Sequence, residues 1–230
     1  MNTQVSTYLE DKPLKFHEIE MLNLISKNYD SEQNFSFLDV GCATGVFIKC
    51  MSDKFFNASF TGIDPSEELI NKAIKYDIKR AVFIKEKSES FEPETKFDCL
   101  LASGVLSIFD DYCEPLKSWL SWLKPDGKLF IFGRFNSEHI DTKVYFKNYF
   151  PTPNPCWESG LNVFSIRTIS SFLKEMGYKS TFMKFELPVK VNKHPDPIRT
   201  FTLELSNGEN LVVNGANTIA EHFFAEIERI

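Results

Sequence analysis

Short apolar runs alternate with segments of helical periodicity along the first 133 residues. The runs expected as strands are 35–40, 58–63, 81–85, 97–102 and 128–133. The segments expected as helices, in which apolar residues recur every three or four positions, are 13–29, 46–56, a stretch starting at 65, and 114–123. Strands that alternate with helices predict βαβ units, and therefore a mostly parallel sheet with helices on both faces. Right-handed crossovers make this a doubly wound α/β fold.

The pattern changes after residue 133. Residues 134–164 are rich in aromatic side chains and include a proline-rich run at 151–155, which is unusual for a plain connector. A helix over 165–176 closed by Gly177, a strand over 181–187 and a hairpin around Asn207-Gly208 are expected next. A last helix is expected over about 218–229, and a turn at 124–127 precedes the fifth strand.

Composition narrows the class of protein. The chain has 230 residues, 43% hydrophobic and 25% charged, as in a soluble globular protein. The net charge is 26 − 32 = −6, which disfavours nucleic acid as a partner. We expect no membrane partner, because no apolar run approaches the ~20 residues of a membrane span. The five cysteines are odd in number and none are spaced C-x-x-C, so we expect a cytoplasmic location and no metal site.

The first chemical signal is a glycine loop after the first expected strand, Leu38-Asp39-Val40-Gly41-Cys42-Ala43-Thr44-Gly45. Glycines allow a tight turn and close approach of a ligand to the backbone. A plain strand-to-helix turn and a nicotinamide-binding loop are the alternatives, although G-x-G-x-x-G is not present. Because Asp39 would repel a pyrophosphate, the loop favours a cationic or amine-bearing ligand.

The second signal is Asp64, in Thr61-Gly62-Ile63-Asp64-Pro65-Ser66, about twenty residues after the loop. A carboxylate at the end of the second strand can accept hydrogen bonds from both hydroxyls of a ribose. The alternative is a helix N-cap, and the two roles do not exclude each other. The two signals together predict a nucleoside site at the carboxyl ends of the strands.

With these motifs the sequence resembles the class I S-adenosylmethionine-dependent methyltransferases, of the small-molecule type. The matching stretches are FLDVGCATG at 37–45, FTGIDPSEELINKA at 60–73, KFDCLLASGVLSIFDD at 96–111 and LKPDGKLFIF at 123–132. The resemblance implies a Rossmann-like methyltransferase fold with seven strands and a β hairpin near the carboxyl terminus. It also implies S-adenosylmethionine as cofactor and S-adenosylhomocysteine as product.

The resemblance assigns roles to residues that match the family's motifs. Asp39 would reach the amino group of the methionine moiety, and Asp64 would bind the ribose hydroxyls. The family often has an Asp just before its adenine contacts, where this chain has Lys87, and many relatives carry a His where Ser107 stands. The remaining expected cofactor contacts are Gly41, Cys42, Ala43 and Gly45 by their backbone, Pro65, Ser66, Ser88 and Glu89 near the adenine, and Ala102, Ser103 and Gly104 beneath the methyl group.

Candidates for catalysis and substrate recognition come from the later chain. His139, Tyr145 and Asp110 are the candidate catalytic residues, against the plainer interpretations of a surface histidine and a helix start at Asp110. The candidate substrate contacts are Tyr145, Tyr149, Trp157 and His194, with a small satellite core as the alternative for the aromatic stretch. His17 and His222 are expected on helices in structural roles.

The function expected is methyl transfer to an oxygen or nitrogen of a small molecule, such as a sugar, a nucleotide-linked compound or a precursor of a bacterial surface polysaccharide. A nicotinamide-dependent oxidoreductase and a non-catalytic cofactor-binding module are the alternatives. We expect one domain, acting as a monomer or homodimer. Its expected parts are a helical cap at 1–30, a cofactor-binding core at 35–133, a substrate-side insertion at 134–164, and a helix, antiparallel strands and final helix at 165–230.

Overall fold

The computed structural model describes residues 13–150 and 153–230. Residues 1–12 of the expected helical cap and residues 151–152 of the expected insertion lie outside the described residues.

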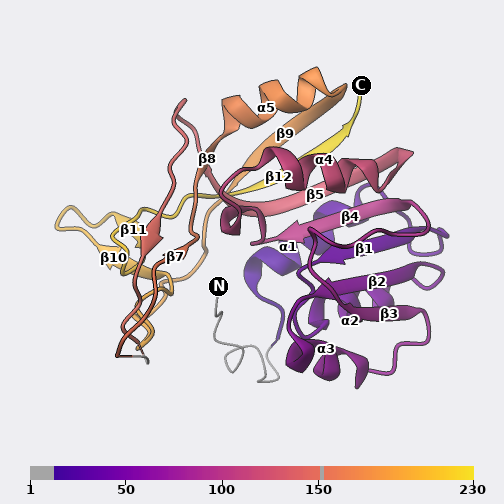
Figure 1. Cartoon of the computed structure of the whole chain (residues 1–230), viewed down its shortest axis with the longest axis horizontal. Helices are drawn as coiled ribbons and strands as arrows, with labels where there is room; N and C mark the ends of the chain where they lie inside the picture. Colours follow the sequence, from indigo (N-terminus) through magenta and orange to yellow (C-terminus); the bar gives the residue numbers. More distant parts are fainter. Residues whose placement is uncertain (1–12, 151–152) are drawn as a thin grey trace.

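Seven strands form the central sheet in the order β3-β2-β1-β4-β5-β12-β9 (Figure 1). The first five of these run parallel, while β12 is antiparallel to both β5 and β9. The expected doubly wound, mostly parallel sheet is therefore confirmed. The strands are β1 (Ser36–Val40), β2 (Ser59–Asp64), β3 (Ala81–Lys85), β4 (Phe97–Ser103), β5 (Leu123–Asn136), β9 (Tyr178–Phe185) and β12 (His222–Arg229).

Helices cover both faces of the sheet (Figure 1). The helices are α1 (Phe16–Ser26), α2 (Val46–Lys54), α3 (Glu67–Ile74), α4 (Cys113–Ser121) and α5 (Ile166–Glu175). One core packs α4 and α5 against the sheet around Trp119 and Leu173, and the other packs α1 and α2 around Ile25 and Met51. Because successive side chains of a strand point to opposite faces, Leu38 enters the α4/α5 core and Asp39 faces α1 and α2.

The expected final helix over 218–229 is wrong, because this segment is the strand β12. Ile219, Phe223 and Ile227 are four residues apart, which is helical spacing. The segment instead lies between β5 and β9, where its backbone pairs on both sides. Phe223 and Ile227 enter the α4/α5 core and Phe224 enters the other core. Tertiary pairing has overridden the local pattern.

Other boundaries differ less. The expected turn at 124–127 belongs to β5, whose register with β4 shifts between Phe97 and Cys99. The expected strand over 181–187 begins earlier, at Tyr178, directly after Gly177. Gly177 has the positive φ of 82° expected for a helix C-cap. The Asn207-Gly208 hairpin is confirmed, and it joins β10 (Phe201–Glu204) to β11 (Asn210–Val213).

Two excursions of the chain form a lobe beyond the carboxyl ends of the parallel strands (Figure 1). The first, within 137–163, contains β6 (Tyr145–Phe146) paired with β7 (Glu158–Ser159), and β8 (Phe164–Ser165) then pairs with the end of β5. The second, within 186–221, contains the β10–β11 hairpin. The Asn148 side chain donates a hydrogen bond to Asp196 Oδ1 at 3.0 Å, which joins the two excursions. We call them together the carboxyl-edge lobe.

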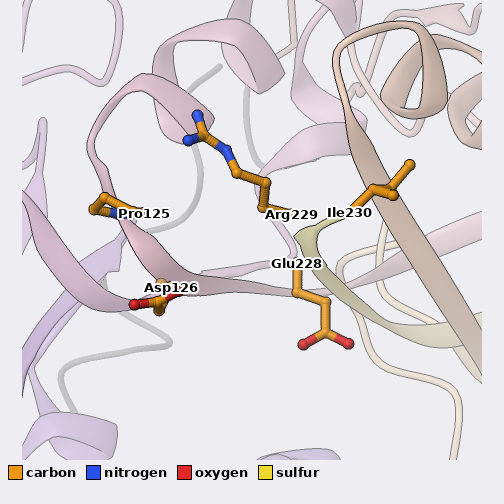
Figure 2. Close-up of a pocket in the computed structure, with 6 residues that line it drawn as sticks. Pro125, Asp126, Glu228, Arg229 and Ile230 are labelled. Carbon is orange, nitrogen blue, oxygen red and sulfur yellow. The ribbon is translucent and has the colours of Figure 1, made fainter.

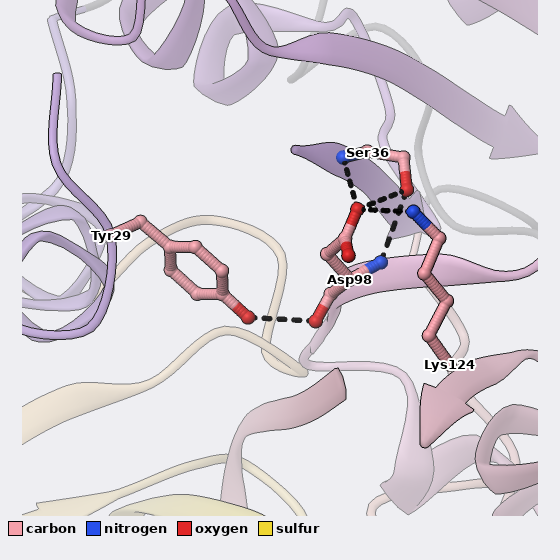
Figure 3. Close-up of polar contacts among 4 residues, drawn as sticks. All are labelled: Tyr29, Ser36, Asp98 and Lys124. Atoms are coloured by element: carbon pink, nitrogen blue, oxygen red, sulfur yellow. Dashed lines mark hydrogen bonds and ion pairs between the residues drawn. The ribbon is translucent and has the colours of Figure 1, made fainter. Parts of the chain in front are cut away.

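A polar network fastens the opposite, amino-terminal edge of the sheet (Figure 3). The Ser36 amide and hydroxyl both donate to Asp98 Oδ2 at 2.7 Å, and Lys124 Nζ lies 2.7 Å from the same oxygen. The Tyr29 hydroxyl donates to the Asp98 carbonyl at 2.7 Å. These contacts tie the chain after α1 to the beginnings of β1, β4 and β5.

Candidate active site

The glycine loop between β1 and α2 has three residues in the left-handed region. Gly41, Ala43 and Gly45 have φ of 75°, 48° and 72°. The amides of Gly41 and Cys42 both donate to the carbonyl of Ile63 in β2, at 2.8 and 3.0 Å. This arrangement turns the loop back across the end of β2 and starts α2 at Gly45, its N-cap.

The loop after β4 lies directly against the glycine loop. A Cβ added to Gly41 would lie 2.6 Å from Val105 Cγ2, so only glycine fits between the two loops. Gly104 has φ of 72° and donates its amide to the Phe132 carbonyl at 2.7 Å. A Cβ added to Gly104 would meet nothing within 4 Å, so the end of β4 borders open space. A ligand can therefore approach the backbone closely at this position.

Asp39 is a buried acid at the end of β1. Its side chain is 3% exposed, and no described residue donates a hydrogen bond to its carboxylate. Burial raises the pKa of Asp39 to about 8, and the charges of Glu18 and Asp64 add to this rise. An unpaired acid among other acids fits a cationic ligand such as an ammonium group. Glu18, on α1, was not singled out from the sequence because α1 comes before the motif and packs against it only in the fold.

Asp64 ends β2 and holds the glycine loop. Its Oδ2 accepts from the Ala43 amide at 3.1 Å and its Oδ1 accepts from the Ser66 amide at 2.8 Å. Burial raises the pKa of Asp64, and these two hydrogen bonds partly oppose the rise. A carboxylate offers about four acceptor positions, so two remain for a diol. The N-cap of α3 is Ser66, whose hydroxyl accepts from the Leu69 amide, so the alternative role of Asp64 as N-cap is wrong.

The other expected cofactor contacts surround this loop. Ala102 is buried and Ser103 half-buried at the end of β4, while Pro65 and Glu89 are exposed. The Ser88 hydroxyl accepts a hydrogen bond from the buried Trp119 indole at 3.3 Å. The loop after β3 is therefore anchored to α4. These adenine contacts stay predictions.

Two catalytic candidates, Asp110 and Tyr145, lie together on the surface. The Tyr145 hydroxyl donates to Asp110 Oδ2 at 3.1 Å, and the Ser159 hydroxyl donates to its Oδ1. The hydrogen bond from Ser159 is the main cause that lowers the pKa of Asp110. Asp110 begins no helix, since α4 begins at Cys113. These hydrogen bonds attach the carboxyl-edge lobe to the chain at Asp110, and the catalytic roles of Asp110 and Tyr145 stay predictions.

The remaining candidates lie on exposed parts of that lobe. Tyr149 is 65% and Trp157 67% exposed, and Lys147 Nζ lies 5.3 Å from the centre of the Trp157 ring. His139 is exposed, and the exposed His194 accepts the Asp196 amide on its Nδ1 at 3.0 Å. The structure does not gather these side chains around the glycine loop. Their role in substrate binding stays a prediction.

The structure instead places four other residues beside the end of β4. His17 stacks on Phe132 with ring centres 4.2 Å apart, and His222 lies parallel to the same ring at 5.4 Å. Arg134 pairs in register with His222. His17 is on a helix as expected, but His222 is on β12, so its expected helical position is wrong. A charged residue directly after the apolar strand was the available signal for Arg134.

Two shallow hollows lie away from this site. Figure 2 shows one of about 370 Å³ between the start of β5 and the end of β12, with Asp126 and Glu228 at its rim. The other, about 330 Å³, lies beside Ser52 and Arg80. Both are at the amino-terminal edge of the sheet. Within 13–150 and 153–230, no cluster of three or more His, Cys, Asp or Glu side chains has metal-binding geometry. No helix in these ranges is long and apolar enough to cross a membrane.

A family model described as a methyltransferase domain matches residues 8–181, well over half of the chain. The chain belongs to this family. It is a class I S-adenosylmethionine-dependent methyltransferase, as its motifs predict. The features of this methyltransferase that fit the cofactor are the unpaired Asp39 carboxylate, the free acceptor positions of Asp64 and the open space at Gly104.

Curated relatives of this methyltransferase have different acceptors in their names. A malonyl-[acyl-carrier protein] O-methyltransferase of Ilyobacter polytropus is 27% identical over 172 residues, 74% of this chain and 64% of that protein. The (S)-coclaurine N-methyltransferase of Papaver somniferum is 27% identical over 159 residues, 67% of this chain and 42% of that protein. The chain thus spans less than two thirds of the length of either relative.

Solved structures share the fold of this methyltransferase. A complex named DhpI-SAM-HEP has a TM-score of 0.63 at 14% identity, covering 98% of this chain and 92% of that one. The plantazolicin methyltransferase BpumL in complex with a triazolic desmethylPZN analogue and SAH has a TM-score of 0.61 at 15% identity, covering 98% of this chain and 90% of that one. At these identities the likeness confirms the Rossmann-like methyltransferase fold.

Proposed function

We propose that this protein transfers the methyl group of S-adenosylmethionine to an oxygen or nitrogen of a small-molecule acceptor. The observation that carries the proposal is the pair of acids at adjacent strand ends, Asp39 without a hydrogen-bond donor and Asp64 with free acceptor positions. Asp39 pairs with the ammonium group of the methionine moiety, and Asp64 accepts from the ribose hydroxyls. The acceptor lies beyond Gly104, where the end of β4 is open.

The reaction is a single displacement. The cofactor would supply a methyl carbon on a sulfonium. The acceptor's lone pair forms the new bond as the carbon–sulfur bond breaks and its electrons return to sulfur, and the proton of a hydroxyl or amine acceptor is released to water. The protein's part is to align the two reactants and exclude water, which is worth several kcal/mol as an order of magnitude. The loops at Gly41 and Gly104 serve that alignment because their backbones leave no side chain between cofactor and acceptor.

The acceptor class is the finer part of the proposal. A sugar, a nucleotide-linked compound or a surface-polysaccharide precursor was expected from the sequence, and it stays a prediction. The names of two curated relatives give malonyl-[acyl-carrier protein] and (S)-coclaurine as acceptors. Malonyl-[acyl-carrier protein] carries its acyl group on a protein, so it belongs to a different acceptor class from the small molecule that we propose. Membership of the methyltransferase family disfavours the nicotinamide alternative.

Calorimetry with S-adenosylhomocysteine and with NADH tests the cofactor half of the proposal. We expect S-adenosylhomocysteine to bind and NADH not to bind. Asp64→Ala should weaken S-adenosylhomocysteine binding by about 1–3 kcal/mol, the cost of losing hydrogen bonds to a charged group. The control is Asp53→Ala, an exposed acid near the far end of α2, which should leave the affinity unchanged. Equal affinities for wild type and Asp64→Ala would remove the ribose assignment.

The non-catalytic alternative is tested by turnover. A panel of acceptors is incubated with S-adenosylmethionine, and release of S-adenosylhomocysteine is measured. We expect release above the acceptor-free rate with at least one acceptor class. Tight cofactor binding without turnover on any acceptor would favour the binding module.

A further inference from the structure

Arg134 is a half-buried cationic residue, and no described carboxylate pairs with it. It lies near the end of β5, and its Nη1 is buried without a hydrogen bond within 13–150 and 153–230. No described carboxylate forms an ion pair with its guanidinium. Burial lowers the pKa of Arg134 to about 10, which leaves it charged at neutral pH. This arginine is not part of the cofactor motifs.

An unpaired interior charge of this kind is costly. Removing an ion from water costs several kcal/mol unless a counter-charge and hydrogen bonds replace the lost hydration. Buried polar groups in folded proteins therefore almost always have partners. Arg80, by comparison, donates to the Phe55 carbonyl, and Arg229 lies over the Tyr178 ring. The missing partner of Arg134 is best supplied by a bound molecule.

The aromatic and imidazole rings near Arg134 carry no charge. Its register partner is His222, and the ring of Phe132, two residues earlier on β5, stacks with both His17 and His222. Burial lowers the pKa of His17 to about 3 and that of His222 to about 4. Both imidazoles are neutral at pH 7, so neither adds a charge near the guanidinium.

The position of Arg134 separates it from the acids of the cofactor site. Strand alternation puts Arg134 and Asp39 on the same face of the sheet, two strands apart, with Arg134 about four residues further along in register. With ~4.8 Å between strands and ~3.3 Å per residue, their Cα atoms are roughly 16 Å apart. Ser103 and Gly104 lie between them. The site therefore has acidic side chains at the cofactor end and a cationic side chain at the other end.

We propose that Arg134 binds an anionic group of the methyl acceptor, a carboxylate or a phosphate, in a subsite formed with Phe132, His17 and His222. The inference rests on the proposed function, since it takes the space beside Gly104 to be the place of methyl transfer. A guanidinium offers two parallel N–H donors that match either anion. The subsite orients an acceptor that carries an anionic group, and its cationic side chain lies at the opposite end of the site from the acids Asp39 and Asp64.

The first test measures anion binding without turnover. Malonate and inorganic phosphate are titrated separately, by calorimetry, into protein saturated with S-adenosylhomocysteine. We expect saturable binding of at least one anion, and the tighter one identifies the group as carboxylate or phosphate. Arg134→Gln should weaken that binding about tenfold or more, the scale of a charged hydrogen bond. Arg134→Lys should restore part of it, because the charge remains without the planar fork.

The matched control is Arg167→Gln, which removes an exposed arginine at the start of α5 on the opposite face. It makes the same change in net charge and should leave anion binding unchanged. Absence of binding of both anions to wild type, while S-adenosylhomocysteine binds normally, would overturn the anion subsite and leave the proposed function intact. A loss of S-adenosylhomocysteine affinity in Arg134→Gln would also overturn it, by placing the cofactor's own carboxylate at Arg134.

The second test separates a ligand-binding role from a structural one. Arg134→Met replaces the charge with an apolar side chain of similar length. We expect the variant without anion to unfold at a higher temperature than wild type, because the unpaired charge is gone. We also expect it to lose the anion-dependent rise in unfolding temperature. A lower unfolding temperature would show that Arg134 stabilises the fold and would contradict the proposal.

Discussion

Asp98 and Asp39 lie at opposite edges of one sheet, the amino-terminal and the carboxyl edge, and their carboxylates differ in the partners that the chain gives them. At the amino-terminal edge, burial alone would raise the pKa of Asp98, but Lys124 and the amide and hydroxyl of Ser36 lower it below its usual value. At the carboxyl edge, burial raises the pKa of Asp39 to about 8, and the neighbouring charges are acidic. One edge supplies every partner its acid needs, while the other leaves its acid unpaired.

The difference indicates which edge serves stability and which serves binding. Hydrogen bonds and ion pairs within the chain stabilise the unliganded fold at Asp98. At Asp39, and at Arg134 further along, the described residues of the unliganded fold leave an ionisable side chain without a partner. Asp39 keeps its proton up to about pH 8, and Arg134 Nη1 is buried without a hydrogen bond. Groups of this kind are retained where a ligand supplies the missing partner. The comparison leads to opposite effects of substitution at the two edges.

The largest effect is expected at the amino-terminal edge. Asp98→Ala removes two hydrogen bonds from Ser36 and the contact with Lys124. We expect a loss of about 2–3 kcal/mol in the free energy of unfolding, after allowance for partial exposure of the carboxylate. Urea unfolding at pH 7 measures it, with the exposed Asp126→Ala as control. Stability equal to wild type would show that the network is dispensable.

At the carboxyl edge, substitution of the acid is expected to raise the free energy of unfolding instead of lowering it. Asp39 keeps its proton up to about pH 8 in the fold, whereas an unfolded Asp loses it near pH 4, so the stability of the fold decreases as pH rises between these values. Asp39→Asn removes this cost. We expect a gain of about 2 kcal/mol in unfolding free energy at pH 8 and no gain at pH 4. A variant less stable than wild type at pH 8 would mean that Asp39 has a partner in the unliganded fold.

The fold and the backbone features of the candidate cofactor site were largely predictable from the sequence, while the cofactor contacts themselves stay predictions. The βαβ alternation, the glycine loop and Asp64 are local signals, because consecutive residues form each strand, turn and helix start. The strands, the left-handed residues Gly41 and Gly45 and the carboxylate at the end of β2 are found where these signals place them. The Asn207-Gly208 hairpin was equally local.

The proposed anion subsite was not predictable because it depends on long-range pairing. The strand β12 carries helical spacing and takes its conformation from β5 and β9 on either side. Only this pairing brings His222 beside Arg134, and only the docking of α1 brings His17 onto Phe132. The aromatic insertion attracted attention by composition, yet Tyr149 and Trp157 are exposed.

Cofactor binding should depend on pH through Asp39. The ammonium group of S-adenosylhomocysteine pairs with the ionised carboxylate of Asp39. In the free protein this ionised form predominates only above about pH 8. We expect affinity to rise about threefold to tenfold per pH unit between pH 6 and 7.5, or about 1 kcal/mol, with release of a proton on binding. Calorimetry in two buffers of different ionisation enthalpy detects that proton. Asp39→Asn should bind more weakly and without pH dependence, and a flat profile for wild type would contradict the pairing.

The smallest effect is expected for His17, which stacks on Phe132 at the carboxyl edge. Burial lowers the pKa of His17 to about 3. His17 therefore stays neutral in the folded protein, whereas in the unfolded chain it is protonated below about pH 6.5. Stability is therefore lost as pH falls from 6.5 towards 3. His17→Phe keeps an aromatic ring against Phe132 and should reduce the loss between pH 7 and 5 by about 0.5–1 kcal/mol, measured by urea unfolding at both pH values. The exposed His139→Phe is the control. An unchanged difference between the two pH values in His17→Phe would show that His17 does not contribute to the acid sensitivity of this edge.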